Sequence, residues 1–302
     1  MYSRNRALGA LVGLAVGDAL GAPLEFCPRG SFTPVAAMTA GGEHGMRRGE
    51  WTDDTAMALC LAESLIECRG FDARDQMERY WRWSREGYNS TREQAFGIGR
   101  TVASAIDHYR CTGEPFAGPD DPWTAGNGSI MRLAPVVIYY LSRPDDAVRY
   151  AAESSRTTHQ AEEAIQACWL MAHLMCRAIY GVQSKAELFL HSPLRDHAVL
   201  LAEIAGRAYL DKQEEQIQGS GYVVESLEAA LWCFETTDSF EDAVLKAVNL
   251  GDDADTTGAV CGQIAGAYYG LDAIPARWVE ELMEGERIVR TAEMLVDAGM
   301  RG

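Results

Sequence analysis

Two stretches decide the fold of this chain: LVGLAVGDALG at residues 11–21 and GAVCGQIAGAYYG at residues 258–270. Glycine recurs at every fourth position in both, at Gly13, Gly17 and Gly21 and again at Gly258, Gly262, Gly266 and Gly270. Residues four apart share a face of an α-helix, so each stretch predicts a helix with a smooth stripe that another backbone can approach closely. Because each interior glycine costs about 1 kcal/mol of helix propensity relative to alanine, the stripes require a packing reason.

Close packing against any neighbouring helix is the simpler explanation of these stripes. The sharper hypothesis is that the two predicted helices pack against each other, antiparallel, in the centre of the protein. This arrangement would bring Glu25, just beyond the first helix, near Asp253 and Asp255 at the start of the second.

Helical patterning dominates the rest of the chain. Apolar residues recur at three- and four-residue spacing in segments 55–68, 161–179, 224–234 and 259–269. The apolar run 136–140 is predicted to lie in a buried helix that extends over 130–141, and breaks are expected at several glycines and prolines, including Pro193. We therefore expect one compact all-α domain, 1–302, of about a dozen helices.

The charge balance limits the possible partners. The 302 residues include 44 acidic and 27 basic side chains, a formal net charge of −17. This acid excess argues against a nucleic-acid binder, because phosphate neutralisation requires clustered Lys and Arg. It also argues against docking on anionic lipid.

The cysteine pattern and the N-terminus bear on location. The eight cysteines form no C-x-x-C motif, which suits a reducing cytoplasm. Arg4 and Arg6 precede an apolar stretch at 7–17 that mimics a signal peptide, but Asp18 and Glu25 interrupt the region where cleavage would occur. No uncharged apolar run reaches ~20 residues, so we expect no membrane-spanning segment. We expect a cytoplasmic monomer.

The chemistry is concentrated in two acidic motifs, WTDDT at residues 51–55 and GDDADTT at residues 251–257. Both motifs precede segments with a strong helical pattern, so N-capping by Asp and Thr is the simpler, purely structural explanation. Capping needs only one or two such residues, whereas close carboxylates repel one another unless a cation neutralises them. The excess of acids therefore favours a metal site. Oxygen-only donors suit Mg²⁺, Mn²⁺ or Ca²⁺, and four or five carboxylates fit two ions better than one.

Two further segments fit an anionic ligand that contains a sugar. Gly126, Asn127, Gly128 and Ser129 are predicted to open a helix, whose N–H groups could hold a pyrophosphate, although a plain loop–helix junction is the simpler explanation of this segment taken alone. Thr157 and Gln160 have the spacing of a capping box, which would project His159 from a first helical turn. A lone histidine is more often structural than functional.

The ordered set of motifs resembles the ADP-ribosylglycohydrolase family, and is most similar to the bacterial branch that contains dinitrogenase reductase-activating glycohydrolase. The matching segments are GDALGAPLE at 17–25, WTDDT at 51–55, GNGSIMR at 126–132, Thr158-His159 and GDDADT at 251–256. The similarity runs from about residue 4 to residue 290, and the two acidic motifs together are its most specific part.

The resemblance implies a compact helical domain with two Mg²⁺ or Mn²⁺ ions in a central cleft. The implied metal ligands are Thr52, Asp53, Asp54, Asp253, Asp255 and Thr256. The implied ADP-ribose site is lined by Gly126, Asn127, Gly128, Ser129 and His159. Glu25 would lie on a mobile loop near the metals and act through water, with Asp53 or Asp54 as the alternative catalytic base.

The chain departs from the family pattern at two positions. The family often has Gly-Gly-Asp where this chain has Gly251-Asp252-Asp253, so Asp252 is an extra acid. Gly97 stands where the nitrogenase-regulating branch places an acid near the substrate arginine, which puts the arginine preference in question.

The resemblance implies hydrolysis of the bond between ADP-ribose and a modified protein side chain, most simply the N-glycosidic bond to arginine. ADP-ribose would be the product, and an ADP-ribosylated protein the partner. Two alternatives stay open: a catalytically silent relative that binds ADP-ribose or has a structural role, as lens crystallins of this family do, and a dinuclear phosphohydrolase acting on nucleotides.

Overall fold

The computed structural model describes residues 2–190, 192 and 199–301, so the predicted break at Pro193 lies outside the described part. Within these residues the chain forms α-helices joined by loops and short 3₁₀ turns, with only two isolated β-bridges. The helices are α1 (Arg4–Gly21), α2 (Asp53–Glu67), α3 (Ala73–Glu86), α4 (Arg100–Thr112), α5 (Ala134–Tyr139), α6 (Pro144–Arg156), α7 (Glu162–Tyr180), α8 (Val199–Ala205), α9 (Val223–Glu235), α10 (Phe240–Val248), α11 (Ala254–Tyr269), α12 (Ala276–Glu281) and α13 (Gly285–Gly299). The all-α prediction is confirmed.

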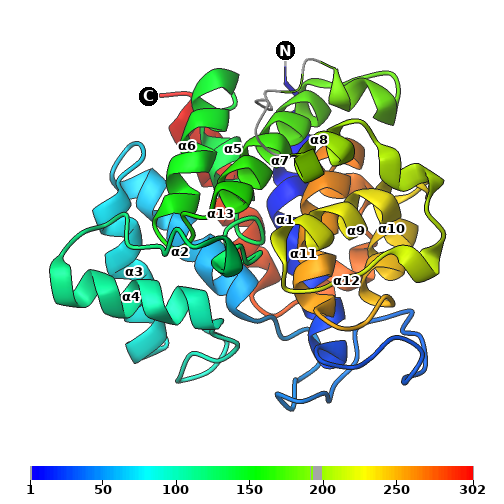
Figure 1. Ribbon diagram of the computed structural model, residues 1–302, viewed down its shortest axis with the longest axis horizontal. Helices are drawn as coiled ribbons and strands as arrows, with labels where there is room; N and C mark the ends of the chain where they lie inside the picture. The colour runs from blue at the N-terminus through cyan, green and yellow to red at the C-terminus, as the bar shows by residue number, and fades with distance from the viewer. Residues whose placement is uncertain (1, 191, 193–198, 302) are drawn as a thin grey trace.

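Helices α1 and α11 form the centre of the molecule and run antiparallel, side by side (Figure 1). Their glycines face one another in pairs. A Cβ atom built on Gly13 would lie 2.2 Å from the carbonyl oxygen of Gly262, and one built on Gly17 would lie 2.0 Å from that of Gly258. The sharper hypothesis about the glycine stripes is therefore confirmed. Gly9, opposite Gly266, extends the pairing by one turn beyond the predicted ladder.

The apolar character of α1 serves the core. The segment Arg4–Leu24 is long and apolar enough to cross a membrane, with a mean hydropathy of 1.6, but its apolar window is entirely buried inside the protein. Every α1 residue from Ala7 to Gly21 is buried. The stretch that mimics a signal peptide is thus the central core helix in this fold.

The other helices surround this pair on two sides. Helices α2, α5 and α13 pack together on one side of α1, and α7, α9 and α10 pack against α11 on the other (Figure 1). Helices α3 and α4 lie outside α2. The four strongly patterned segments are confirmed as α2, α7, α9 and α11, with boundaries that differ by a few residues at most.

The predicted helix over 130–141 is wrong in extent. Helix α5 spans only Ala134–Tyr139, and Ile130 and Met131 instead donate their backbone N–H groups to the carbonyl of Asn127 in a turn. Pro135 explains the late start, because proline lacks an N–H and is tolerated only in the first turn of a helix. The apolar run itself is buried, as predicted.

Candidate active site

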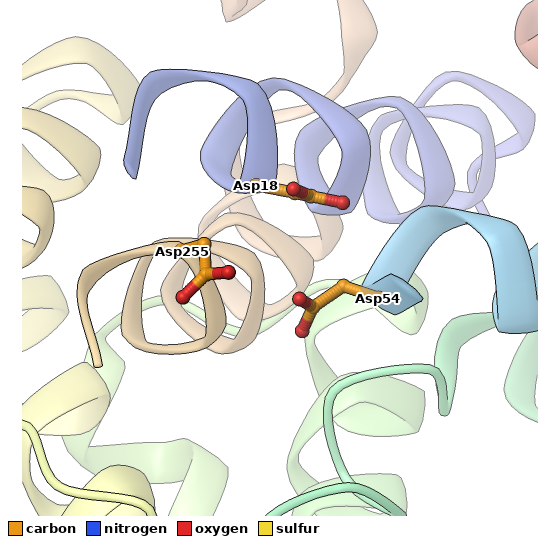
Figure 2. Close-up of side chains that lie close together, drawn as sticks. All are labelled: Asp18, Asp54 and Asp255. Atoms are coloured by element: carbon orange, nitrogen blue, oxygen red, sulfur yellow. The ribbon is translucent and has the colours of Figure 1, made fainter. Parts of the chain in front are cut away.

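Three buried carboxylates from three different helices meet beside the central helix pair. Asp18 comes from α1, Asp54 from the first turn of α2 and Asp255 from the first turn of α11, and they point toward one another (Figure 2). Carboxylate oxygens of the three residues lie within 4.8 Å of one another. The glycine contacts make this possible, because they let the start of α11 approach the end of α1 closely.

Asp18 was not among the residues predicted to form the site. Its carboxylate accepts hydrogen bonds from the backbone N–H groups of Thr52 (2.9 Å) and Thr55 (3.0 Å) and from both threonine hydroxyls. Asp18 thus caps the start of α2 from another helix. Its occurrence as an acid inside an otherwise apolar helix is the sequence signal that could have identified it.

This cap changes the interpretation of the first acidic motif. Thr52, the residue before α2, makes no side-chain capping bond to its own helix, and the Asp53 and Asp54 carboxylates are not needed for capping. The Oδ1 atom of Asp54 is buried without a hydrogen-bond partner in the described part of the protein. A buried carboxylate oxygen with a free lone pair fits a metal ligand, so the residues present are compatible with a bound metal ion.

Burial and mutual repulsion raise the pKa values of the clustered acids. Burial raises the pKa of Asp18 to about 6. Burial, followed by the charges of Asp18 and Asp53, raises the pKa of Asp54, and burial with the charges of Glu25 and Asp54 raises that of Asp255. A divalent cation among these oxygens would relieve both the repulsion and the loss of solvation.

The remaining predicted acids lie next to this cluster. Glu25 follows the short 3₁₀ turn Ala22–Leu24, and burial together with the charge of Asp253 raises its pKa to about 8. The Oε2 atom of Glu25 lies 3.1 Å from Nε2 of His44, a neighbour that was not predicted. Asp53 is also buried. The expected approach of Glu25 to the start of α11 is therefore confirmed.

We expect the metal-free protein to become less stable as the pH rises from about 4 to about 8. Asp18 and Glu25 have folded-state pKa values of about 6 and 8, above their ordinary values of 3.8 and 4.5, so these two groups bind more protons in the folded form than in the unfolded form in this range. The stabilisation is complete below the ordinary values and is lost as the pH passes the raised ones. Melting temperatures in EDTA at pH 5 and pH 8 measure this effect, and Glu25→Gln should reduce the difference. An unchanged or higher melting temperature at pH 8 would contradict it.

A cavity of about 1040 Å³ opens beside the acids. The predicted residues that line it are Glu25, Asp53, Gly126, Asn127, Gly128, His159, Asp253, Asp255 and Thr256. The volume suits a ligand of nucleotide size. Asp255 belongs to both the cavity wall and the buried cluster, so it connects the two.

Three predicted residues lie behind the cavity wall. Thr52 is buried, and its hydroxyl oxygen lies 3.0 Å from Oδ2 of Asp54. Asp54 itself belongs to the buried cluster. Ser129 accepts a hydrogen bond from the hydroxyl of Ser155 at 3.0 Å and does not line the cavity.

The glycine segment 126–129 does not begin a helix, so the predicted helix N-terminus at this position is wrong. The N–H of Asn127 donates to Gly221, and its side chain donates to Oδ2 of Asp253 at 2.8 Å, which holds that acid at the cavity. A different helix presents its N-terminus to the cavity. Residues Gly99 to Val102 at the start of α4 line it, and Gly99 provides no side-chain cap.

The predicted capping box around His159 is also wrong. Thr157 is the C-cap of α6, its hydroxyl donates to the carbonyl of Ser154, and α7 begins only at Glu162. The side chain of Gln160 donates to the carbonyls of Phe116 and Gly118. His159 therefore lies in the loop between the helices, 2% exposed, against the cavity.

The two departures from the family pattern have different structural outcomes. Asp252 is exposed, adopts a left-handed backbone conformation with φ of 56°, and belongs neither to the buried cluster nor to the cavity lining. Gly97 lines the cavity with φ of 78°, and a Cβ atom there would lie 2.5 Å from Oδ1 of Asp53. Any side chain at position 97 would displace the Asp53 carboxylate.

The sequence and the fold are similar to those of known proteins. Residues 2–302 match the sequence profile of the family described as ADP-ribosylglycohydrolase. The chain is 42% identical over 293 residues to the ADP-ribosylarginine hydrolase Tri1 of Serratia proteamaculans, covering 97% of this chain and 79% of that protein. It is 34% identical over 291 residues to the ADP-ribosyl-[dinitrogen reductase] glycohydrolase of Rhodospirillum rubrum, covering 95% and 93%.

A solved structure has the same fold. It is described as an ADP-ribosylglycohydrolase-related protein complex and superimposes with a TM-score of 0.88 at 44% sequence identity, covering 98% of this chain and 99% of that chain. The match of the family profile extends over almost the whole sequence. As the resemblance of its motifs predicts, the chain belongs to the ADP-ribosylglycohydrolase family of enzymes.

Proposed function

We propose that this enzyme is a metal-dependent hydrolase that removes ADP-ribose from modified protein side chains by cleaving the N-glycosidic bond to arginine. The observation that carries the proposal is the acidic cluster next to a nucleotide-sized cavity, joined through Asp255. The arginine linkage is supported by the relatives, because the Serratia protein is named an ADP-ribosylarginine hydrolase.

The proposed cofactor is a pair of divalent cations, Mg²⁺ or Mn²⁺, held by the oxygens of the two acidic motifs. The proposed ligands are Thr52, Asp53, Asp54, Asp253, Asp255 and Thr256. Asp18 is better suited to a supporting role, because Thr52 and Thr55 already occupy its lone pairs with hydrogen bonds. When bound, the ions supply Lewis-acid contacts to vicinal ribose hydroxyls and to a water molecule.

The protein's own groups supply the proton chemistry and the charge. Glu25 lies at the cavity beside His44 and near Asp255, so it is the proposed general base for the attacking water, with Asp53 or Asp54 as alternatives. Positive charge develops on the ribose as the glycosidic bond breaks. The surrounding carboxylates of Asp53, Asp253 and Asp255 are placed to stabilise that charge.

The other part of the cavity is the proposed site for the rest of ADP-ribose. Gly126, Asn127, Gly128 and His159 form its wall, and Ser129 supports this wall from behind. The uncapped start of α4 offers N–H groups, and the adjacent Arg100 offers a positive charge, to the diphosphate. An acidic protein needs such donors in order to bind a ligand that is itself an anion.

We expect the protein to release free ADP-ribose from ADP-ribosylarginine when Mg²⁺ or Mn²⁺ is present, and to lose this activity in EDTA. The assay should compare protein substrates joined through arginine and through serine, followed by chromatography of the released nucleotide. Calorimetric binding of ADP-ribose without turnover of any linkage would favour a silent relative. Release of inorganic phosphate in place of ADP-ribose would identify a phosphohydrolase.

A further inference from the structure

Arg132 is a buried cation without a carboxylate partner in the described residues. It lies beside the glycine turn, and its guanidinium donates to Tyr80 Oη (3.1 Å), to the carbonyl of Gly128 and to the hydroxyls of Thr157 (3.4 Å) and Thr158 (2.7 Å). Buried charges are normally paired, because leaving water is costly. An arginine held only by neutral groups next to a cavity therefore requires an explanation.

The hydrogen bonds from Arg132 determine the direction of the next one. A guanidinium has donors only, so the Thr158 hydroxyl oxygen accepts from Arg132 and keeps its own hydrogen for another acceptor. The neighbouring group is Nδ1 of His159, 2.9 Å away. No other acceptor for this hydrogen lies within hydrogen-bond distance among the described residues, so we assign Nδ1 as the acceptor, which places the ring proton on Nε2.

The charge state agrees with this direction. Burial, together with the positive charge of Arg132, lowers the pKa of His159 to about 3. The imidazole is therefore neutral near pH 7, with one nitrogen as donor and the other as acceptor.

The protonated nitrogen lies next to Gly126 and Gly128, which line the cavity together with His159. A Cβ atom built on Gly126 would lie 3.2 Å from Nε2, and one built on Gly128 would lie 2.8 Å from Cε1. Because Gly126 and Gly128 have no side chains, the imidazole of His159 fits against them at the cavity wall. The two glycines therefore serve this packing and do not begin the predicted helix. In the described part of the chain Nε2 has no hydrogen-bond partner.

We propose that Arg132 is a positioning residue that acts through Thr158 to hold His159 as the Nε2–H tautomer, which then donates a hydrogen bond to an oxygen of bound ADP-ribose. The donor role rests on the proposed function, whereas the tautomer rests on the contacts of Arg132 and Thr158 alone. The uncompensated charge of Arg132 additionally favours an anionic ligand in the adjacent cavity.

Nitrogen NMR of the wild-type protein, labelled with ¹⁵N-histidine, tests the tautomer without any structural substitution. The signals of the six histidines are assigned by comparison with His159→Gln. At pH 7 we expect His159 to show a protonated Nε2 and an unprotonated Nδ1. A proton on Nδ1, or on both nitrogens, would overturn the proposal.

Two substitutions at position 158 test whether Arg132 acts on His159 through the Thr158 hydroxyl. Thr158→Ser keeps the hydroxyl and should preserve both the tautomer and the affinity for ADP-ribose within about twofold. Thr158→Val keeps the shape but removes the hydroxyl, and should yield a mixture of tautomers and about tenfold weaker binding of ADP-ribose, as expected for the loss of one oriented hydrogen bond. Arg132→Met should produce the same mixture. If the folded Thr158→Val and Arg132→Met variants keep the wild-type tautomer, Arg132 does not act on His159 through Thr158.

Titration with ADP-ribose tests the donor role of His159 separately from the proposed function. We expect a change in the ¹H and ¹⁵N shifts of the His159 Nε2–H group on binding. If calorimetry shows binding while these signals stay unchanged, the donor role is overturned. If ADP-ribose does not bind at all, the proposed function fails and the donor role fails with it, whereas the NMR spectrum of the free protein still decides the tautomer.

Discussion

Replacing Asp255 with asparagine is expected to lower the rate of ADP-ribose release by about 10³-fold or more, equivalent to about 4 kcal/mol of transition-state stabilisation. Asp255 is the acid shared by the buried cluster and the cavity wall. Its replacement removes a proposed metal ligand and one of the carboxylates that face the developing positive charge. The loss should appear in kcat, and excess Mn²⁺ should restore it only in part.

The same substitution should have the opposite effect on the stability of the metal-free protein. The pKa of Asp255 is raised by burial and by the charges of Glu25 and Asp54, so its ionised form is disfavoured in the folded state. Asparagine removes one of these repelling charges while keeping the shape. We therefore expect a higher melting temperature in EDTA together with a smaller increase on addition of metal.

Asp252→Asn is the matched control, because it makes the same chemical change three residues away at an exposed position. Asparagine also tolerates the left-handed conformation that Asp252 adopts. We expect this variant to keep the wild-type rate and the wild-type response to metal. Full activity of the Asp255→Asn variant would exclude Asp255 from the active site.

Replacing Gly17 with alanine is expected to destabilise the protein by about 3 kcal/mol, which lowers the melting temperature by about 5 °C. The new methyl group would lie 2.0 Å from the carbonyl oxygen of Gly258 and 2.4 Å from its carbonyl carbon. Backbone atoms of two buried helices cannot rotate away as a flexible side chain can. The overpacking therefore exceeds the gain of about 1 kcal/mol in helix propensity that alanine provides.

Metal affinity should fall in parallel with stability. Separation of α1 from α11 would move Asp18, and the start of α2 that it caps, away from Asp255. Denaturant unfolding and titration with Mn²⁺ measure the two effects on the same sample. Gly30→Ala serves as the control, because its methyl group would meet no atom within 4 Å and adds only the strain of a positive φ. Equal stability of the two variants would contradict the proposed packing.

The position of the acidic centre was largely predictable. The period of four in the glycine stretches predicts the pairing of α1 with α11, and this pairing places Glu25 near the start of α11. The two helix starts carry more acids than capping requires, and this excess is the feature that indicates a metal site. Asp18 was missed because one carboxylate inside an apolar helix has no partner that is visible in the sequence, whereas its four donors come from residues 52 and 55.

The local errors have one cause. The sequence near Gly126 and near Thr157 has the local pattern of helix starts, but those polar groups are used in contacts with distant segments. Asn127 pairs with Gly221 and Asp253, and Gln160 pairs with the loop near Gly118. A local pattern cannot include such partners, because they become neighbours only after the chain has folded.

The sequence by itself determined the helical class, the family, the central helix pair and the acids that meet at its end, because these depend on periodicity and residue type. Only the tertiary structure decided which of these groups face the cavity and which support it from behind. It assigned Asp18 to capping, placed Ser129 behind the wall and oriented His159 through Arg132 and Thr158. The physical reason is that hydrogen-bond partners and burial, unlike helical periodicity, depend on contacts between residues far apart in the chain.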